Sequence, residues 1–342
     1  MNFYIQEREK MTRVAINGLG RIGRTFLKLA IEKKIDVVAV NDLTDCKNLA
    51  YLLKYDSVYG VWHKKIEVGN NFLKIKGKKI IALSEKNPEK LPWKKLGVDI
   101  VIESTGFFTE KGNVHFVAGA KKVLITAPCK NNQITIVPGV NDVLLKKNHT
   151  LISVASCTTN CFVPIAHVLH SAFDIERGFM TTVHAYTADQ RLQDAPHEKF
   201  RRGRAAAENL VPTTSGVLFA LNQVMPELAG KIDGLAIRAP VMCGSLVDFS
   251  VMLKKSISRN EINAALKKAA AGNLKGIIEY SEDELVSRDV IGNPHSAVVD
   301  SLSTQIIDEG HGCGTMAKVL AWYDNEFGYS NRLVDVVGMV KI

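Results

Sequence analysis

The stretch "VAINGLGRIGRTFLKLAI", residues 14–31, decides the fold class. A short apolar run is followed at once by three glycines spaced G-x-G-x-x-G, at Gly18, Gly20 and Gly23. Apolar residues at helical spacing come next, so the pattern predicts a strand, a tight turn and a helix. This is the arrangement of the first strand–helix unit in a dinucleotide-binding sheet.

Each glycine has its own physical task in that arrangement. Gly18 permits the tight turn, Gly20 lets the backbone approach a pyrophosphate, and Gly23 lets the helix lie close to its strand. The helix N-terminus offers N–H groups and a positive dipole end to phosphate. Asp42 follows 19 residues after Gly23, where a carboxylate accepts hydrogen bonds from the ribose hydroxyls and repels a 2′-phosphate. The sequence therefore predicts NAD rather than NADP; the alternative is an ordinary glycine turn.

Further apolar runs indicate that this sheet continues. "VDIVIESTG", "KVLITAP" and "TLISV" read as buried parallel strands with loops at their carboxyl ends. In the second half, Ser258 to Glu261 form a capping box before a predicted helix that ends at Gly272. The chain is predicted to be an α/β protein, with a Rossmann-type doubly wound parallel sheet and a second α+β domain of mixed sheet.

The stretch "SVASCTTNCFVP", residues 153–164, holds two cysteines. Cys157 stands between a strand and an apolar-periodic helix, so we expect it at a helix N-terminus, where the dipole lowers the pKa of a thiol. Cys161 is one turn later and is expected to pack. A zinc site would need about four nitrogen or sulfur ligands, and no second cysteine pair or HxxxH motif lies nearby in the sequence. A disulfide within one helical turn would be unusual. A purely structural cysteine remains the main alternative to a nucleophile.

A histidine further along favours the nucleophile. In "MTTVHAYTADQ", His184 follows a strand-like run. A nucleophilic thiol needs a base to take and return protons. A helix-start cysteine, a strand-end histidine and a dinucleotide site together indicate a dehydrogenase that acts through a thiol adduct.

Composition narrows the class of protein. The 342 residues suffice for two domains, and no apolar run approaches the roughly 20 residues that span a bilayer. The N-terminus lacks the apolar core of a signal peptide, so we expect a cytoplasmic protein with reduced thiols. The formal charge of +9 comes from scattered lysines. This scatter favours a solvated basic surface over nucleic-acid binding, and steering of anionic small molecules is a third use.

From about Thr12 to the C-terminus the chain resembles the phosphorylating glyceraldehyde-3-phosphate dehydrogenase family. The motifs that carry the resemblance occur in the family's order: "INGLGRIGR", "LLKYDSVYG", "ESTGFF", "ASCTTNC", "HAYTADQ", "RRGRAAA", "LAIRAP" and "WYDNEFGYSNR". The resemblance implies an NAD-binding domain over 12–156, completed by a C-terminal helix over 323–342 that packs on it. It also implies a catalytic domain over 157–322, and residues 1–11 form an N-terminal extension.

The resemblance also assigns the site residues. Cys157 matches the nucleophile and His184 the general base. The implied cofactor-binding residues are Gly18, Gly20, Arg21, Ile22, Gly23, Asp42, Thr126 and Asn325, the last of which binds the nicotinamide carboxamide. The implied residues for substrate and phosphate are Ser156, Thr158, Ser215 and Gly216, with Thr187 and Arg238 for the substrate's own phosphate. No metal is implied.

The implied reaction is NAD-dependent, phosphorylating oxidation of glyceraldehyde 3-phosphate in a homotetramer, with Pro196 in a loop beside a neighbour's cofactor site. Three positions depart from the family pattern: Val154 replaces Asn, Ser215 replaces Thr and Phe219 replaces a common Lys. An erythrose-4-phosphate dehydrogenase is the near alternative, although Thr187 and Ser215 keep their hydroxyls. A non-catalytic nucleic-acid or surface-binding protein is the alternative from another class, and only the net charge supports it.

Overall fold

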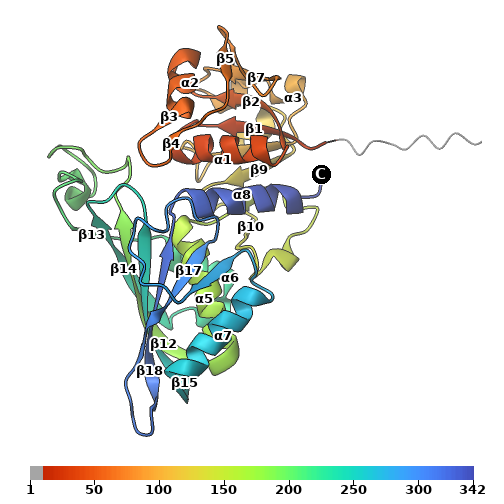
Figure 1. The fold of residues 1–342 in the computed structure, drawn as a ribbon. Helices are drawn as coiled ribbons and strands as arrows, with labels where there is room; N and C mark the ends of the chain where they lie inside the picture. Colours follow the sequence, from red (N-terminus) through yellow and green to blue (C-terminus); the bar gives the residue numbers. More distant parts are fainter. Residues whose placement is uncertain (1–10) are drawn as a thin grey trace, which may run out of the picture.

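The computed structural model describes residues 11–342 and distributes them between two sheets, with the final helix α8 lying between the two halves (Figure 1). The predicted N-terminal extension lies outside the described residues except for Met11. Among the described residues, none of the helices is both long and apolar enough to cross a membrane.

The first half forms a nine-stranded sheet in the order β10-β11-β9-β8-β1-β2-β7-β6-β5. Its strands from β10 to β7 are parallel, and β6 and β5 add an antiparallel edge. The strands are β1 Arg13–Asn17, β2 Asp36–Asn41, β5 Ile66–Val68, β6 Phe72–Ile75, β7 Lys78–Leu83, β8 Ile100–Glu103, β9 Lys122–Ile125, β10 Ile134–Thr135 and β11 Leu151–Ser153, and a separate hairpin pairs β3 Tyr55–Asp56 with β4 Gly60–Val61.

Both faces of this sheet are buried, because successive residues of a strand point to opposite sides. In β1, Val14 and Ile16 join one apolar cluster, whereas Ala15 between them joins another on the opposite face. The helices of this half are α1 Arg21–Glu32, α2 Cys46–Lys54, α3 Trp93–Leu96 and α4 Val114–Val117, with short 3-10 turns at Pro88–Lys90 and Asp142–Leu144. Apolar burial on both faces is what a doubly wound sheet requires, and the predicted fold class is confirmed.

The second half forms a seven-stranded mixed sheet in the order β13-β14-β12-β15-β18-β17-β16. Its inner face packs on α5, α6 and α7, and the predicted capping box closes the start of α7. The elements are α5 Cys157–Phe173, β12 Ile175–Ala185, β13 Val211–Thr213, α6 Val217–Val224, β14 Ile232–Ala239, β15 Ser245–Ser258, α7 Arg259–Ala271, β16 Ile278–Ser281, β17 Ala297–Ile306 and β18 Cys313–Tyr323, with 3-10 turns at Phe200–Gly203 and Pro226–Leu228.

The outer face of this second sheet carries exposed apolar side chains. Phe179 and Val183 on β12 point to the same side as Leu235 on the neighbouring strand β14, and all three are exposed. A row of large apolar side chains exposed on a sheet is typical of a surface that another protein covers.

The last helix, α8, spans Phe327–Met339 and packs on α1 and on the cluster beneath it. The sequence predicts this segment over 323–342, but the helix itself is shorter: Tyr323 still pairs within β18, and the Asp324 carboxylate accepts hydrogen bonds from the N–H groups of Glu326 and Phe327. These two bonds fix the helix start after Glu326, because they satisfy donors that a helix leaves free at its first turn.

The packing of α8 predicts the stability of a variant. Leu333→Ala removes a fully buried side chain and should lower the free energy of unfolding by about 3 kcal/mol, because a cavity replaces its contacts. Met339→Ala, at the partly exposed end of the same helix, is the matched control and should change it by less than about 0.5 kcal/mol. Urea unfolding measures both, and equal losses would contradict the packing described here.

Candidate active site

The nucleophile candidate lies where the chain passes from one sheet to the other. Strand β11 ends at Ser153 and α5 begins at Cys157, with Ser156 capping the helix through a bond from the Thr159 N–H. Cys157 contacts the apolar clusters of both halves. Its Sγ lies 3.4 Å from Nε2 of His184 at the end of β12. Two residues 27 positions apart are thus within reach for proton transfer.

The hydrogen bonds of His184 assign its tautomer. Nδ1 lies 2.6 Å from the carbonyl oxygen of Ala185, which can only accept, and 3.0 Å from Nη1 of Arg238, which can only donate. The shorter contact, to the carbonyl, favours the tautomer with the ring proton on Nδ1. The lone pair of Nε2 then faces the sulfur of Cys157. Arg238 Nη1 donates to the same carbonyl and to the Thr187 hydroxyl, at 3.1 and 3.3 Å. The ring is therefore arranged as a base toward Cys157.

The electrostatics correct one prediction. The helix dipole is expected to lower the pKa of Cys157, but burial raises the pKa of this thiol, and the charge of Arg238 opposes that rise without cancelling it. Burial and the positive charge of Arg238 together lower the pKa of His184 to about 3. Both shifts favour the uncharged forms of the two side chains, and Nε2 of His184 lies within reach of the thiol proton.

A cavity of about 1260 Å³ surrounds this pair. Seven of the predicted residues line it: Ser156, Cys157, Thr158, His184, Ser215, Gly216 and Arg238. Thr187 does not line the cavity but contacts Arg238. The Nε of Arg238 is buried and has no hydrogen-bond partner among the described residues. An unpaired buried guanidinium N–H beside hydroxyl groups fits an anionic oxygen such as that of a phosphate.

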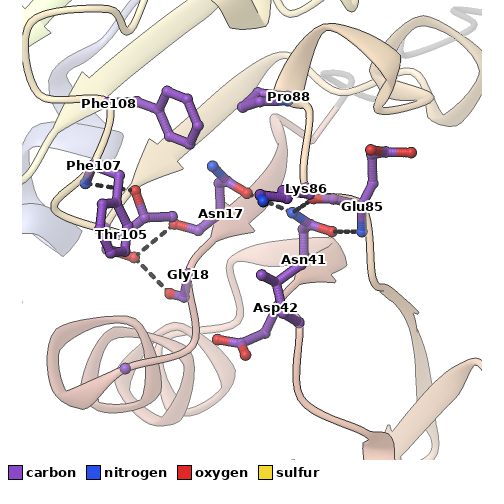
Figure 2. A pocket seen from close by; sticks show the side chains of 13 residues that line it. Asn17, Gly18, Asn41, Asp42, Glu85, Lys86, Pro88, Thr105, Phe107 and Phe108 are labelled. Carbon is purple, nitrogen blue, oxygen red and sulfur yellow. Dashed lines mark hydrogen bonds between the residues drawn. The ribbon is translucent and has the colours of Figure 1, made fainter.

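A second cavity, of about 520 Å³, lies at the carboxyl end of β1 and β2 (Figure 2). Gly18, Gly20 and Asp42 line it. Asp42 accepts hydrogen bonds from the N–H groups of Leu19 and Thr44, at 2.8 and 3.0 Å, so its carboxylate is held beside the glycine turn. A Cβ on Gly18, whose φ is +93°, would lie 2.7 Å from the backbone of Thr105, so only glycine fits there.

The remaining predicted cofactor residues do not line either cavity. The Arg21 side chain pairs with Asp56 and Glu326, and Ile22 packs against the core.

A Cβ on Gly23 would collide with the carbonyl of Gly18, as expected of a helix close to its strand. Thr126 donates to the Glu103 carbonyl, and the buried Asn325 accepts a bond from the Ser245 hydroxyl at 2.9 Å.

The two cavities meet at Phe107, which lines both. Thr105 precedes it in the glycine-turn cavity, and Gly106 lines the cavity of Cys157. The two cavities are therefore neighbours, and a ligand that extended from Asp42 toward the thiol would pass Phe107.

The alternatives for the cysteines can now be weighed. All six cysteines are free, and Cys161 is fully buried in the core, as predicted. Within residues 11–342, no group of three or more His, Cys, Asp or Glu side chains is placed to hold a metal ion. The position of Cys157, beside a histidine and inside a large polar cavity, favours a nucleophile over a structural thiol.

Sequence reasoning missed Arg202, which lines this cavity, and Tyr323, which lies behind its wall. The Tyr323 hydroxyl bonds to Thr158 and Thr182, at 3.0 and 2.8 Å, and its ring lies edge-on to His184. Arg202 lines the cavity and donates to the Thr213 hydroxyl. Both lie within motifs quoted for the resemblance, "WYDNEFGYSNR" and "RRGRAAA". The sequence alone does not show that either side chain lies near Cys157 in the folded protein.

Two of the unusual positions have definite surroundings. Val154 is fully buried, and Asn160 donates to its carbonyl at 2.9 Å, while the Oδ1 of Asn160 has no hydrogen-bond partner in the described part of the chain. An Asn at position 154 would be expected to provide a polar contact beneath the loop of Cys157, and the apolar side chain of Val154 cannot provide it. Phe219, on α6, does not line the cavity of Cys157.

Comparisons with known proteins match both halves of the chain. Residues 12–111 match the family model described as glyceraldehyde 3-phosphate dehydrogenase, NAD binding domain, and residues 156–325 match its C-terminal domain. Glyceraldehyde-3-phosphate dehydrogenase of Geobacillus stearothermophilus is 53% identical over 332 residues, which cover 96% of this chain and 98% of the relative. The enzyme of the same name from Borreliella burgdorferi is 51% identical over 333 residues, covering 95% and 98%.

The geometry predicts how Arg238 affects the thiol. Arg238→Leu removes the positive charge that favours the thiolate of Cys157 and that also lowers the pKa of His184. We expect the direct loss at the sulfur to outweigh the gain in basicity of His184, so alkylation by iodoacetamide at pH 7.5 should slow by roughly three- to tenfold. Arg204→Leu removes an exposed arginine that pairs with Asp194 and serves as the control, with an unchanged rate. Faster alkylation in Arg238→Leu would contradict the assigned electrostatics.

Proposed function

The chain belongs to the glyceraldehyde 3-phosphate dehydrogenase family, and on that premise we propose that Cys157 and His184 carry the family's NAD-dependent oxidation of glyceraldehyde 3-phosphate. The observation that carries this assignment is the 3.4 Å contact between Sγ and Nε2 inside a cavity that also holds Arg238. The protein is an NAD-dependent oxidoreductase, and the roles of individual residues are the proposal.

The first step is attack by sulfur. As Sγ bonds to the aldehyde carbon, the thiol proton passes to Nε2 of His184 and the carbonyl π electrons move to oxygen. His184 then returns this proton to the oxygen, which gives a thiohemiacetal and leaves the imidazole neutral. The backbone N–H of Cys157, at the first position of α5, is available to the developing oxyanion. Because burial favours the neutral thiol, this step needs a base, and His184 lies beside the sulfur to serve as one.

The second step oxidises the adduct. His184 takes the hydroxyl proton, the C=O bond re-forms, and the hydrogen on carbon leaves with its electron pair. NAD, when bound, accepts that hydride. The product is a thioester on Cys157, in which the oxidation energy is kept as an acyl group that a nucleophile can take.

The third step releases the acyl group. An oxygen of orthophosphate bonds to the thioester carbon, the C–S bond breaks, and sulfur leaves as a thiolate that His184 can reprotonate. The product is 1,3-bisphosphoglycerate. We assign Thr158, Ser215 and Gly216 to this phosphate, and Thr187 with Arg238 to the phosphate of the substrate. The unpaired Nε of Arg238 supports that assignment.

Cofactor recognition follows from the glycine-turn cavity. Gly18 and Gly20 line it beside the unsatisfied N–H groups at the start of α1, where no acidic residue stands in the first turn. Such a start accepts a pyrophosphate. The carboxylate of Asp42 is held on the rim, where it can bond to ribose hydroxyls and repel the extra phosphate of NADP.

The near alternative is an erythrose-4-phosphate dehydrogenase. Its thioester would be hydrolysed, so NADH formation would not depend on phosphate. The hydroxyls of Thr187 and Ser215 favour the phosphorylating enzyme, and the relatives reported above carry the name glyceraldehyde-3-phosphate dehydrogenase.

We further propose that the NAD-binding domain spans 12–156 together with the C-terminal segment 323–342 that contains α8, that the catalytic domain spans 157–322, and that the protein acts in the cytoplasm. The contact of α8 with α1 supports this division, and six free cysteines suit a reducing compartment. Limited proteolysis and cell fractionation test these two proposals.

The oxidation mechanism predicts the behaviour of a nucleophile variant. Cys157→Ser should lower NADH formation by at least about a thousandfold, because the serine hydroxyl is a much weaker acid and nucleophile than the thiol. NAD binding should persist in this variant. The control is Cys313→Ser, on β18 outside the cavity lining, which should keep its activity. Near-full activity in Cys157→Ser, or NADH formation independent of phosphate in the unaltered protein, would contradict the proposed reaction.

The exposed face of the second sheet predicts the assembly. We propose a homotetramer in which a second copy covers Phe179, Val183 and Leu235. Phe179→Asp places a charge in that surface and should shift sedimentation toward smaller species, because burying an unpaired charge is costly. The control is Phe107→Asp, which alters an exposed side chain on the cavity rim and should leave the assembly intact. An unchanged sedimentation coefficient for Phe179→Asp would contradict this interface.

A further inference from the structure

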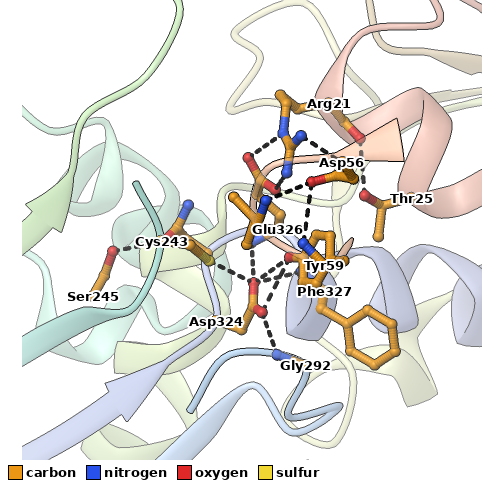
Figure 3. A network of polar contacts seen from close by, with 12 residues as sticks. Arg21, Thr25, Asp56, Tyr59, Cys243, Ser245, Gly292, Asp324, Glu326 and Phe327 are labelled. Atoms are coloured by element: carbon orange, nitrogen blue, oxygen red, sulfur yellow. Dashed lines mark hydrogen bonds and ion pairs between the residues drawn. The ribbon is translucent and has the colours of Figure 1, made fainter. Parts of the chain in front are cut away.

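A buried carboxylate lies outside both cavities and collects donors from distant parts of the chain. Asp324 is 1% exposed and belongs to the short segment between β18 and α8. Its carboxylate accepts hydrogen bonds from the Tyr59 hydroxyl at 2.9 Å, the Cys243 thiol at 3.2 Å and the Gly292 N–H at 2.7 Å (Figure 3). Tyr59 comes from the hairpin beside the first sheet, whereas Cys243 and Gly292 come from loops of the second half.

The residue that follows Asp324 is Asn325, which is assigned to the nicotinamide carboxamide. Its Oδ1 accepts a hydrogen bond from the Ser245 hydroxyl. That same hydroxyl oxygen accepts the N–H of Ala185, the residue next to His184. Asn325 is thus linked through Ser245 to the strand that carries the catalytic base. Asp324, its neighbour in the sequence, anchors the segment to which Asn325 belongs.

The next residue, Glu326, holds the start of the cofactor-binding helix. The Glu326 carboxylate takes a two-point contact from Arg21, at 2.9 Å from Nε, and Arg21 also pairs with the nearly buried Asp56. Arg21 is the first residue of α1, directly after Gly20 of the glycine turn. A guanidinium paired at two points fixes orientation as well as distance.

We propose that Asp324 is a positioning residue for NAD: its hydrogen bonds fix the segment 324–326 so that Asn325 and the Arg21 helix start keep one geometry across the two halves. The proposal rests on the proposed function of Asn325. The segment is then ordered when the protein folds, so NAD binding does not have to supply the free energy for ordering it. Loss of a bond to Asp324 or of the Arg21 pair therefore weakens NAD binding more than it alters the chemical steps at Cys157.

The experiment compares two variants with a matched control. Tyr59→Phe removes one hydroxyl from Asp324, and Glu326→Gln removes the charge that holds Arg21. Ser301→Ala removes another buried hydroxyl bond, to the Ser281 carbonyl at 2.6 Å, on the far strands β17 and β16. The Kd for NAD is measured by titration calorimetry on the full-length protein, together with the kcat, the KM for each substrate and the midpoint of thermal unfolding.

Tyr59→Phe should raise the Kd and KM for NAD by roughly fivefold, and Glu326→Gln by roughly tenfold. In both, the kcat at saturating NAD and the KM for glyceraldehyde 3-phosphate should stay within about twofold of the unaltered protein. Ser301→Ala should lower the thermal midpoint without changing the Kd for NAD.

Two results would overturn the inference alone. One is an NAD Kd within twofold of the unaltered protein in both Tyr59→Phe and Glu326→Gln. The other is a loss of NAD affinity in Ser301→Ala equal to theirs, which would mean that general loosening is the cause. Absence of NAD binding by the unaltered protein would instead overturn the proposed function, and this inference with it.

Discussion

Three residues join the last strand of the first sheet, β11, to α5, the helix that packs on the second sheet, and the active-site geometry depends on this connection. Val154 is buried in the core of the first half, and Ala155 beside it is buried in the core of the second. Ala155 adopts a positive φ of 53°, which costs a non-glycine residue of order 1 kcal/mol. Asn160 and Tyr329 hold this conformation through bonds to the carbonyls of Val154 and Ala155, at 2.9 and 3.0 Å. The packing of both cores therefore fixes where Cys157 stands.

That position explains the electrostatics of the site. A thiol set between two cores loses solvent, so burial raises its pKa more than the nearby Arg238 lowers it. The same burial keeps His184 neutral near pH 7, with its free nitrogen toward the sulfur. Arg238 could contribute in two ways, because its charge favours the thiolate and its buried Nε has no hydrogen-bond partner among the described residues, which leaves it free for the phosphate proposed above.

Much of this could be predicted from sequence because the relevant signals are local. The spacing of Gly18 and Gly23, the helix start at Cys157 and the capping box of α7 each lie within one turn or one strand end, and the family comparisons confirm the fold and the reaction class. What could not be predicted depends on distant contacts. The dipole argument for Cys157 counted one helix and missed the burial that two cores impose. Tyr323 belongs to the surroundings of Cys157 because its hydroxyl bonds to two threonines that lie 165 and 141 residues earlier in the chain, and no local pattern reveals such contacts.

The central claim is that Cys157 carries the substrate as an acyl group while His184 moves the protons. The most direct test is mass spectrometry of the protein mixed with NAD and glyceraldehyde 3-phosphate without inorganic phosphate, then quenched in acid, since the thioester cannot then be released by phosphate. We expect a phosphoglyceryl group on the peptide that contains Cys157, and its removal when phosphate is added before the quench. An unmodified Cys157 peptide, or an acyl group on another cysteine, would rule out Cys157 as the acyl carrier.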